Sequence, residues 1–217
     1  MSRDLLDRLE QGPAGEMALG PGAVLLPGLA LAEERALIEQ VEALARAAPF
    51  RHLATPGGGR MSVAMTNCGP LGWHSDRRGY RYEPVDPQTG QPWPAMPQRF
   101  RELAVQAAAR AGHAGFAPDA CLVNRYETGA RMALHQDHDE RDGSAPIVSV
   151  SLGAPAVFLW GGAARGDRPR RLALESGDVV VWGGPSRFTF HGVAPVRRAD
   201  HPLTGTLRYN LTFRRAG

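Results

Sequence analysis

The chain has 217 residues, which suits one domain of ordinary to large size, and its hydrophobic fraction of 43% is typical of a packed globular protein. Lys and Arg number 25 against 22 Asp and Glu, so the composition permits a nucleic-acid partner without indicating one. The stretch 143–164 lacks charged side chains, but Ser, Gly and Pro interrupt it, which argues against a membrane helix, and we expect no membrane partner.

The first half of the chain predicts two helices separated by long loops. In residues 31–49 the apolar side chains follow a 3.6-residue period, and Pro49 ends the segment. Residues 55–96 are rich in Gly, Pro and aromatic side chains, which predicts ordered loops around short strands such as 61–65. A second helix is expected over 96–112, where Pro97 suits the first turn and Gly112 suits the C-terminal cap.

The second half of the chain predicts strands. Short runs of β-branched and aromatic residues recur between turn signals, at 120–126, 147–152, 156–160, 171–175, 178–183, 188–193 and 206–214. This spacing indicates an antiparallel sandwich or barrel of the jelly-roll kind. The predicted fold class is therefore α+β, mostly β, with the helices at the front of the chain.

The two cysteines and the N-terminus bear on the compartment. Cys68 and Cys121 lie far apart without C-x-x-C spacing, which argues against a disulfide framework or a thiolate zinc site and suits a reducing cytosol. Residues 1–11 mix acidic and basic side chains without an apolar run, unlike a signal peptide. We therefore expect a cytoplasmic protein in which both thiols are buried.

The segment "LHQDHDE", residues 134–140, collects side chains that bind metals. If residues 134–138 are extended, His135 and Asp137 point to the same side, and His191 at the end of an apolar run is the best third ligand. Two imidazoles and one carboxylate leave open positions, as in non-haem Fe(II) sites, whereas zinc usually takes four ligands. An isolated H-x-D is common by chance and is more often a surface pair.

The last predicted strand strengthens this interpretation. Alternation along 206–214 places Arg208, Asn210 and Arg214 on one face. A solvated polar face is the ordinary explanation for such a pattern. Inside a jelly roll, however, two guanidinium groups suit a dicarboxylate, to which Asn124 and Tyr126 can add hydrogen bonds. An iron site beside a dicarboxylate site suggests 2-oxoglutarate as the co-substrate.

The ordered set of H-x-D, a distant His and R-x5-R resembles the AlkB family of Fe(II)- and 2-oxoglutarate-dependent nucleic-acid dealkylating dioxygenases, and is closest to its bacterial DNA-repair members. The resemblance extends to "TPGG", "MSVAMTNCG", "LGW", "PIVSVSLG" and "GDVVVWGG", and covers nearly all of the chain after about residue 20. It implies one catalytic domain over 1–217. In this domain an N-terminal helical extension spans about 20–54, a nucleotide-recognition lid about 55–96, and a double-stranded β-helix about 115–217.

The resemblance also implies roles for individual residues. The iron ligands would be His135, Asp137 and His191, and O2 would be the second co-substrate. Arg208 and Tyr126 would hold the distal carboxylate of 2-oxoglutarate, Arg214 and Asn124 would steady its chelating end, and Asn210 would support the pocket.

The implied reaction is oxidative demethylation of bases such as 1-methyladenine and 3-methylcytosine, with release of formaldehyde and conversion of 2-oxoglutarate to succinate and CO2. The implied substrate is alkylated single- or double-stranded DNA, with RNA as a further candidate, and the implied enzyme is a monomer. A methyl group inside a duplex cannot reach a buried iron, so the damaged nucleotide must be flipped out. Trp73 would stack on this base opposite His135, and Asp139 would accept from its exocyclic amine. The phosphate and backbone contacts would come from Tyr80, Arg81 and Tyr82, and Arg165 would be a further substrate residue.

Three positions and two alternative functions stay open. Glu140 is expected to lie in a solvated acidic turn. At Gly59 and Arg60 the lid reads "GGGR", where the resemblance leads us to expect an aromatic residue, so lid flexibility or lesion preference would differ. The alternative functions are a dioxygenase of the same fold that acts on a protein or small molecule, and a non-enzymatic metal-containing module that recognises damaged DNA.

Overall fold

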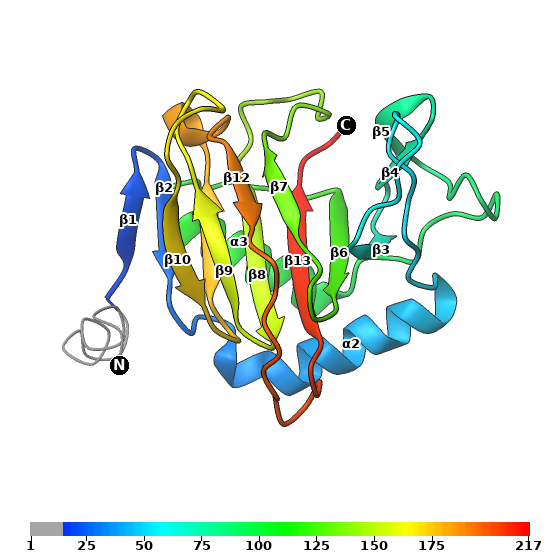
Figure 1. Cartoon of the computed structure of the whole chain (residues 1–217), viewed down its shortest axis with the longest axis horizontal. Helices are drawn as coiled ribbons and strands as arrows, with labels where there is room; N and C mark the ends of the chain where they lie inside the picture. Colours follow the sequence, from blue (N-terminus) through cyan, green and yellow to red (C-terminus); the bar gives the residue numbers. More distant parts are fainter. Residues whose placement is uncertain (1–14) are drawn as a thin grey trace.

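The computed structural model describes residues 15–217, so the N-terminal residues 1–11 discussed above lie outside it. Two antiparallel sheets pack face to face, and two helices cover the outer face of the larger sheet (Figure 1). The larger sheet has the strand order β1 (Met17–Gly20), β2 (Ala23–Leu26), β11 (Val179–Trp182), β8 (Ile147–Gly153), β13 (Arg208–Arg214), β6 (Ala120–Tyr126) and β3 (Ala64–Cys68).

The smaller sheet has four strands, in the order β10 (Arg170–Leu174), β9 (Ala156–Trp160), β12 (His191–Val193) and β7 (Met132–His135). A separate hairpin of β4 (Gly72–Asp76) and β5 (Gly79–Glu83) stands beside this sandwich (Figure 1). The predicted fold class, a mostly β jelly roll with helices, is confirmed. Within residues 15–217, no helix has the length and apolarity needed to cross a membrane.

Both predicted helices are present. A 3-10 turn, η1 (Leu31–Glu33), leads into α2 (Glu34–Ala47), whose buried face consists of Leu37, Ile38, Val41 and Leu44. The second helix, α3 (Gln98–Arg110), begins one residue after Pro97 rather than including it. Gly112 follows the helix with φ of +83°, the left-handed conformation that ends a helix at little steric cost for glycine. Both helices pack on the same core cluster as the larger sheet.

Alternation along the strands divides the interior into two cores. In β11, Val179 and Val181 face the helices, whereas Val180 and Trp182 face the space between the sheets. Strand β13 follows the same rule, because its apolar residues belong to the helix-side core and its polar residues face the interior of the sandwich. That polar face is buried, with Arg208 at 1% and Arg214 at 6% exposure, so a solvated face is excluded.

Three predicted boundaries need correction. The segment 20–54 is not wholly helical, since β2 pairs with β11 and extends the larger sheet. The predicted strand at 61–65 lies at 64–68, where β3 forms the opposite edge of that sheet, so the predicted lid segment 55–96 contains a core strand as well as the β4–β5 hairpin. The strand predicted over 188–193 is formed only by its last three residues, because a 3-10 turn, η2 (Gly184–Ser186), precedes it.

Candidate active site

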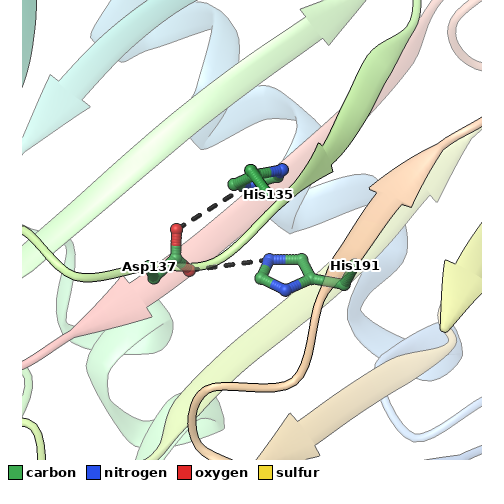
Figure 2. A group of neighbouring side chains, drawn as sticks. All are labelled: His135, Asp137 and His191. Carbon is green, nitrogen blue, oxygen red and sulfur yellow. Dashed lines mark ion pairs between the residues drawn. The ribbon is translucent and has the colours of Figure 1, made fainter. Parts of the chain in front are cut away.

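The three predicted metal ligands lie together at one end of the smaller sheet. His135 on β7 and His191 on β12 are direct cross-strand partners, and Asp137 lies two residues beyond the end of β7. The strand is thus shorter than the predicted 134–138. Asp137 nevertheless points toward both imidazoles, with its carboxylate oxygens 3.7 Å from Nε2 of each histidine (Figure 2). One ligand atom from each residue lies within 4.8 Å of the others.

Backbone carbonyls fix the orientation of both imidazoles. Nδ1 of His135 lies 2.9 Å from the carbonyl oxygen of Ala133, and Nδ1 of His191 lies 2.9 Å from that of Thr189. Because a carbonyl oxygen only accepts, each Nδ1 carries the hydrogen and each Nε2 turns a lone pair toward Asp137. This second hydrogen bond is the usual support for a metal-bound imidazole.

The protonation states also suit a divalent cation. Burial alone would raise the pKa of Asp137, but Arg214 and the two imidazoles together hold this pKa below its ordinary value. Burial, followed by the neighbouring His135, lowers the pKa of His191 to about 4. At neutral pH the site therefore offers an ionised carboxylate and a neutral His191, the states that metal coordination requires.

A cavity of about 650 Å3 opens from the metal-ligand set toward the β4–β5 hairpin. Most of the predicted site residues line it, namely Trp73, Tyr80, Asn124, Tyr126, His135, Asp137, Asp139, Arg165, His191, Arg208, Asn210 and Arg214. Arg81 and Tyr82 are not among the residues that line it. The cavity thus joins the ligand set, the polar face of β13 and one face of the hairpin.

Arg208 lies in the wall of this cavity with unused hydrogen-bonding capacity. Its Nη2 donates to Ser151 Oγ at 3.0 Å, whereas Nε and Nη1 have no hydrogen-bond partner among residues 15–217. Burial lowers the pKa of this guanidinium, and Arg208 is 1% exposed. A buried cation whose donors are unpaired is costly unless an anion joins it. The residues present therefore fit a bound carboxylate such as the distal end of 2-oxoglutarate.

The neighbouring polar residues form a column along β13 and β6. Asn124 and Asn210 are cross-strand partners, and the Asn124 amide donates to Asn210 Oδ1 at 3.3 Å. Asn210 in turn donates to Ser149 Oγ at 2.8 Å. Arg214, at the end of the column, donates from Nη2 to Asp137 Oδ2 at 2.8 Å, and its Nη1 has no partner in the described chain. Arg214 is thus tied to the metal-ligand set while it keeps one free donor.

The expected solvated turn at Glu140 is wrong. The Glu140 side chain is 2% exposed, and its carboxylate pairs with Arg187 at 2.9 Å and with Arg214 at 3.0 Å. It also accepts a hydrogen bond from the Tyr82 hydroxyl at 2.8 Å. Arg187 could not be predicted as a partner of Glu140, because it stands in no recognisable spacing with the acidic residues.

Three hairpin residues differ from their expected arrangement. The Tyr82 hydroxyl points to Glu140 in the core rather than outward, so it is not free to contact a phosphate in this structure. The Arg81 guanidinium is occupied by ion pairs with Asp76 at 2.9 Å and Glu83 at 2.7 Å. Tyr80 is 47% exposed and stacks on Trp73, with ring centroids 5.5 Å apart and an interplanar angle of 16°.

The cavity mouth combines an aromatic pair with an acid. Trp73 Nε1 donates to Asp139 Oδ2 at 2.7 Å, which links the hairpin to the metal-ligand loop. Arg165 also lines the cavity, and its Nη2 donates to the carbonyl of Leu134 at 3.0 Å. Gly59, where the resemblance led us to expect an aromatic residue, lies in an exposed turn. The Thr55 amide closes this turn by donating to the Gly59 carbonyl at 2.7 Å.

Comparisons with known proteins agree with this site. Residues 22–214 match the family described as 2OG-Fe(II) oxygenase superfamily. The chain is 54% identical over 213 residues to the alpha-ketoglutarate-dependent dioxygenase AlkB of Escherichia coli (strain K12), which is 98% of this chain and 99% of that protein. It is 35% identical over 170 residues to the DNA N(6)-methyladenine demethylase ALKBH1C of Arabidopsis thaliana, which is 66% of this chain and 37% of that protein.

The fold is also similar to the solved structure of OsALKBH1. The TM-score is 0.83 at 31% sequence identity, and the match covers 92% of this chain and 99% of that one. Family membership brings a requirement for Fe(II) and 2-oxoglutarate, for which the ligand set and Arg208 have the fitting chemistry. The chain therefore belongs to the 2OG-Fe(II) oxygenase superfamily and, within it, to the AlkB family of dioxygenases.

Proposed function

We propose that this protein removes alkyl groups from the nitrogens of nucleobases by oxidation, as a direct-reversal DNA repair enzyme. The observation that carries the proposal is the content of one cavity. It holds a His-Asp-His set, a buried guanidinium with unpaired donors and a pair of stacked aromatic rings beside an acid. The relation to ALKBH1C, which carries the name of a DNA demethylase, supports a nucleic-acid substrate.

In this proposal His135, Asp137 and His191 hold Fe(II). They leave the remaining coordination positions open toward the cavity, as the two-His-one-carboxylate arrangement does in oxygenases. The bound iron, with 2-oxoglutarate and O2, supplies the oxidation of an unactivated C–H bond. The backbone carbonyls behind the two imidazoles keep Nε2 of each ring directed at the metal.

Arg208 and Tyr126 bind the distal carboxylate of 2-oxoglutarate. The unpaired donors of Arg208 offer charged hydrogen bonds to a carboxylate, and the Tyr126 ring beneath the guanidinium restricts its orientation. Arg214 and Asn124 lie farther along the same wall, where they steady the end of the co-substrate that faces the metal, and Asn210 supports both. Their burial excludes water, which strengthens these charged contacts.

The mouth of the cavity receives a flipped base. Trp73 and Tyr80 offer aromatic surface for stacking, and His135 bounds the other side. Asp139 uses Oδ2 to accept from Trp73, which leaves Oδ1 for the exocyclic amine of an alkylated adenine or cytosine. Its negative charge also offsets the positive charge of 1-methyladenine and 3-methylcytosine. Arg165, which also lines the cavity, suits the sugar-phosphate backbone.

The proposed reaction consumes one O2 and one 2-oxoglutarate for each methyl group removed. One oxygen atom of O2 enters succinate as 2-oxoglutarate loses CO2, and the other is inserted into a C–H bond of the N-methyl group. The hydroxymethyl product of cationic 1-methyladenine or 3-methylcytosine then loses its hydroxyl proton and breaks its C–N bond, so that the ring nitrogen regains its lone pair and the carbon leaves as formaldehyde. The protein's part is to exclude water and to align the methyl group with the metal.

We further propose a monomer in the cytoplasm that acts on single- or double-stranded DNA and also accepts RNA. Cys68 and Cys121 are both free and buried, which supports a reducing compartment. Size-exclusion chromatography with light scattering tests the monomer, and parallel assays on the three nucleic acids rank the substrates.

The function is tested by mass spectrometry of oligonucleotides that carry 1-methyladenine or 3-methylcytosine. Incubation with protein, Fe(II), 2-oxoglutarate and O2 should convert the methylated strand to the unmodified mass, and omission of 2-oxoglutarate should prevent this. Oxygen-dependent succinate without loss of methyl would instead indicate an enzyme that acts on another substrate. Absence of succinate would indicate a metal-containing binding module.

A further inference from the structure

Arg187 braces the loop that carries Asp137, although it does not line the cavity. The side chain is 2% exposed, and each of its three nitrogens donates at 2.9 Å. Nε donates to the carbonyl of Ala145, Nη1 to the carbonyl of Asp137, and Nη2 to Oε2 of Glu140. One planar guanidinium therefore fixes three points of the segment 137–145.

Glu140 connects this brace to two other elements. Its Oε1 accepts from the Tyr82 hydroxyl on β5 at 2.8 Å and pairs with Nε of Arg214 on β13 at 3.0 Å. Two guanidinium groups and the two carboxylates of Asp137 and Glu140 thus form one buried, charge-balanced network. Charges buried in this way are stable only while every partner is in place.

The network reaches the metal-ligand set by two routes. Arg187 holds the backbone of Asp137 through its carbonyl, and Arg214 holds the carboxylate of the same residue at 2.8 Å. Since Asp137 lies beyond the end of β7, no strand pairing fixes its position. These side-chain contacts therefore replace the backbone ladder that holds His135 and His191.

The network reaches the lid through the β4–β5 hairpin. Tyr82 is the cross-strand partner of Trp73, so the Tyr82–Glu140 bond anchors the strand pair that presents the stacking tryptophan. Asp139, adjacent to Glu140, forms a second hydrogen bond to the hairpin by accepting from Trp73 Nε1. The segment 137–140 thus carries a metal ligand, Asp137, and two residues that bond to side chains of the hairpin, Asp139 and Glu140.

We propose that Arg187 is a positioning residue that holds the metal-ligand loop and the nucleotide-binding hairpin in register with each other through Glu140. The identity of metal and base rests on the proposed function, whereas the bracing contacts do not. Loss of the guanidinium fork should loosen Asp137 and the Tyr82 and Trp73 side chains together, because the bonds that hold them depend on the same loop.

The test compares Arg187→Lys with Tyr82→Phe. Lysine keeps the positive charge beside Glu140 but cannot reach three acceptors. Titration of metal-free protein with Co(II), followed by its visible absorption, should show affinity weakened roughly 10- to 100-fold by Arg187→Lys, as for other outer-shell partners. The KM for a 1-methyladenine oligonucleotide should rise as well, with a smaller change in kcat. Tyr82→Phe should raise the KM for oligonucleotide while Co(II) affinity stays near that of the parent protein.

Arg101→Lys is the matched control, because it removes a guanidinium-to-carbonyl bond, from Nη1 to Pro118 at 2.8 Å, outside the cavity lining. Parent-like Co(II) affinity and oligonucleotide KM in a folded Arg187→Lys protein would overturn the proposal, as would equal losses in Arg101→Lys. If Arg187→Lys does not fold, Glu140→Gln must show the same paired losses, and parent-like values there overturn it. Co(II) binding needs no turnover, so failure to demethylate would refute the proposed function while leaving this arm of the test intact.

Discussion

Arg208 lies over the ring of Tyr126, its guanidinium carbon 4.9 Å from the ring centroid, and the two residues are direct cross-strand partners between β13 and β6. The register of the larger sheet therefore sets this contact. The aromatic face supports the cation, and Nε and Nη1, which have no hydrogen-bond partner among residues 15–217, remain available for an incoming anion. The fold thus prepares a carboxylate site at a fixed distance along β13 from Arg214.

Replacing Arg208 with Lys should weaken 2-oxoglutarate binding selectively. An ammonium keeps the charge but loses the fork and the flat contact with Tyr126, and hydrogen bonds to charged groups contribute about 1.5 to 3 kcal/mol. We expect the KM for 2-oxoglutarate to rise roughly 10- to 100-fold, with little change in Co(II) affinity. Arg171→Lys, on the exposed side of β10, is the control. An unchanged KM would mean that the co-substrate lies elsewhere.

Acid should destabilise the metal-free protein through His191. The pKa of this group falls from 6.5 in the unfolded chain to about 4 in the folded one, so the unfolded state binds the proton more readily. The neutral imidazole's contribution to the free energy of unfolding is complete above pH 6.5 and is lost as the pH falls toward 4. A pKa shift of this size corresponds to roughly a few kcal/mol. The depressed pKa of Asp137 acts only below this window.

Urea unfolding between pH 7 and pH 4 checks this expectation. The free energy of unfolding should fall with acidification in the parent protein, and His191→Gln should flatten that slope. His113→Gln, which replaces an imidazole outside the ligand set, should keep the parent slope. Identical slopes in the parent and His191→Gln proteins would show that the imidazole is not buried in its neutral form.

Replacing Trp73 should separate base binding from co-substrate turnover. Stacking on a base contributes about 1 to 3 kcal/mol, so Trp73→Ala should raise the KM for a methylated oligonucleotide by roughly 5- to 150-fold. Succinate formation in the absence of nucleic acid should persist, because the hydrogen bonds of Trp73 go to Asn67 and Asp139, outside the metal-ligand set. Trp73→Phe retains the stacking surface but loses the donor to Asp139, so its KM for the oligonucleotide should lie between those of the parent protein and Trp73→Ala. Equal loss of both activities would argue against stacking.

Replacing Asp139 with Asn should reduce discrimination in favour of charged lesions. The substitution preserves shape and removes one negative charge at the cavity mouth, where a charge pair is worth about 1 to 4 kcal/mol. We expect kcat/KM to fall more for cationic 3-methylcytosine than for neutral 3-methylthymine. Competition assays on mixed oligonucleotides measure the ratio directly. An equal fold-decrease in kcat/KM for both bases would show that the Asp139 carboxylate does not recognise the charge of the lesion.

Local patterns predicted the part of the site that strands carry. The period of two along β13 placed Arg208, Asn210 and Arg214 on one face, and burial of that face between the sheets follows from the jelly roll. The convergence of His191 on the H-x-D pair could be proposed because both segments contain strands. The neighbours β1 and β2 were not foreseen, since four-residue strands among glycine and proline give too short a pattern.

Contacts between loops could not be predicted in the same way. The path of residues 136–145 depends on Arg187, which lies far away in sequence and shows no periodic relation to Glu140. An acidic run such as "DHDE" is usually solvated, and only the tertiary structure shows that a buried guanidinium faces it. The orientation of Tyr82 could not be predicted for the same reason, because its hydrogen-bond partner Glu140 lies 58 residues away in the sequence.

The most direct test is a crystal structure of the protein with Mn(II), a redox-silent substitute for Fe(II), and 2-oxoglutarate, with the metal located by anomalous scattering. The account predicts one Mn(II) bound by His135, Asp137 and His191, with the distal carboxylate of 2-oxoglutarate paired to the guanidinium of Arg208. A metal that leaves any of the three side chains uncoordinated, or a co-substrate that does not contact Arg208, would contradict it.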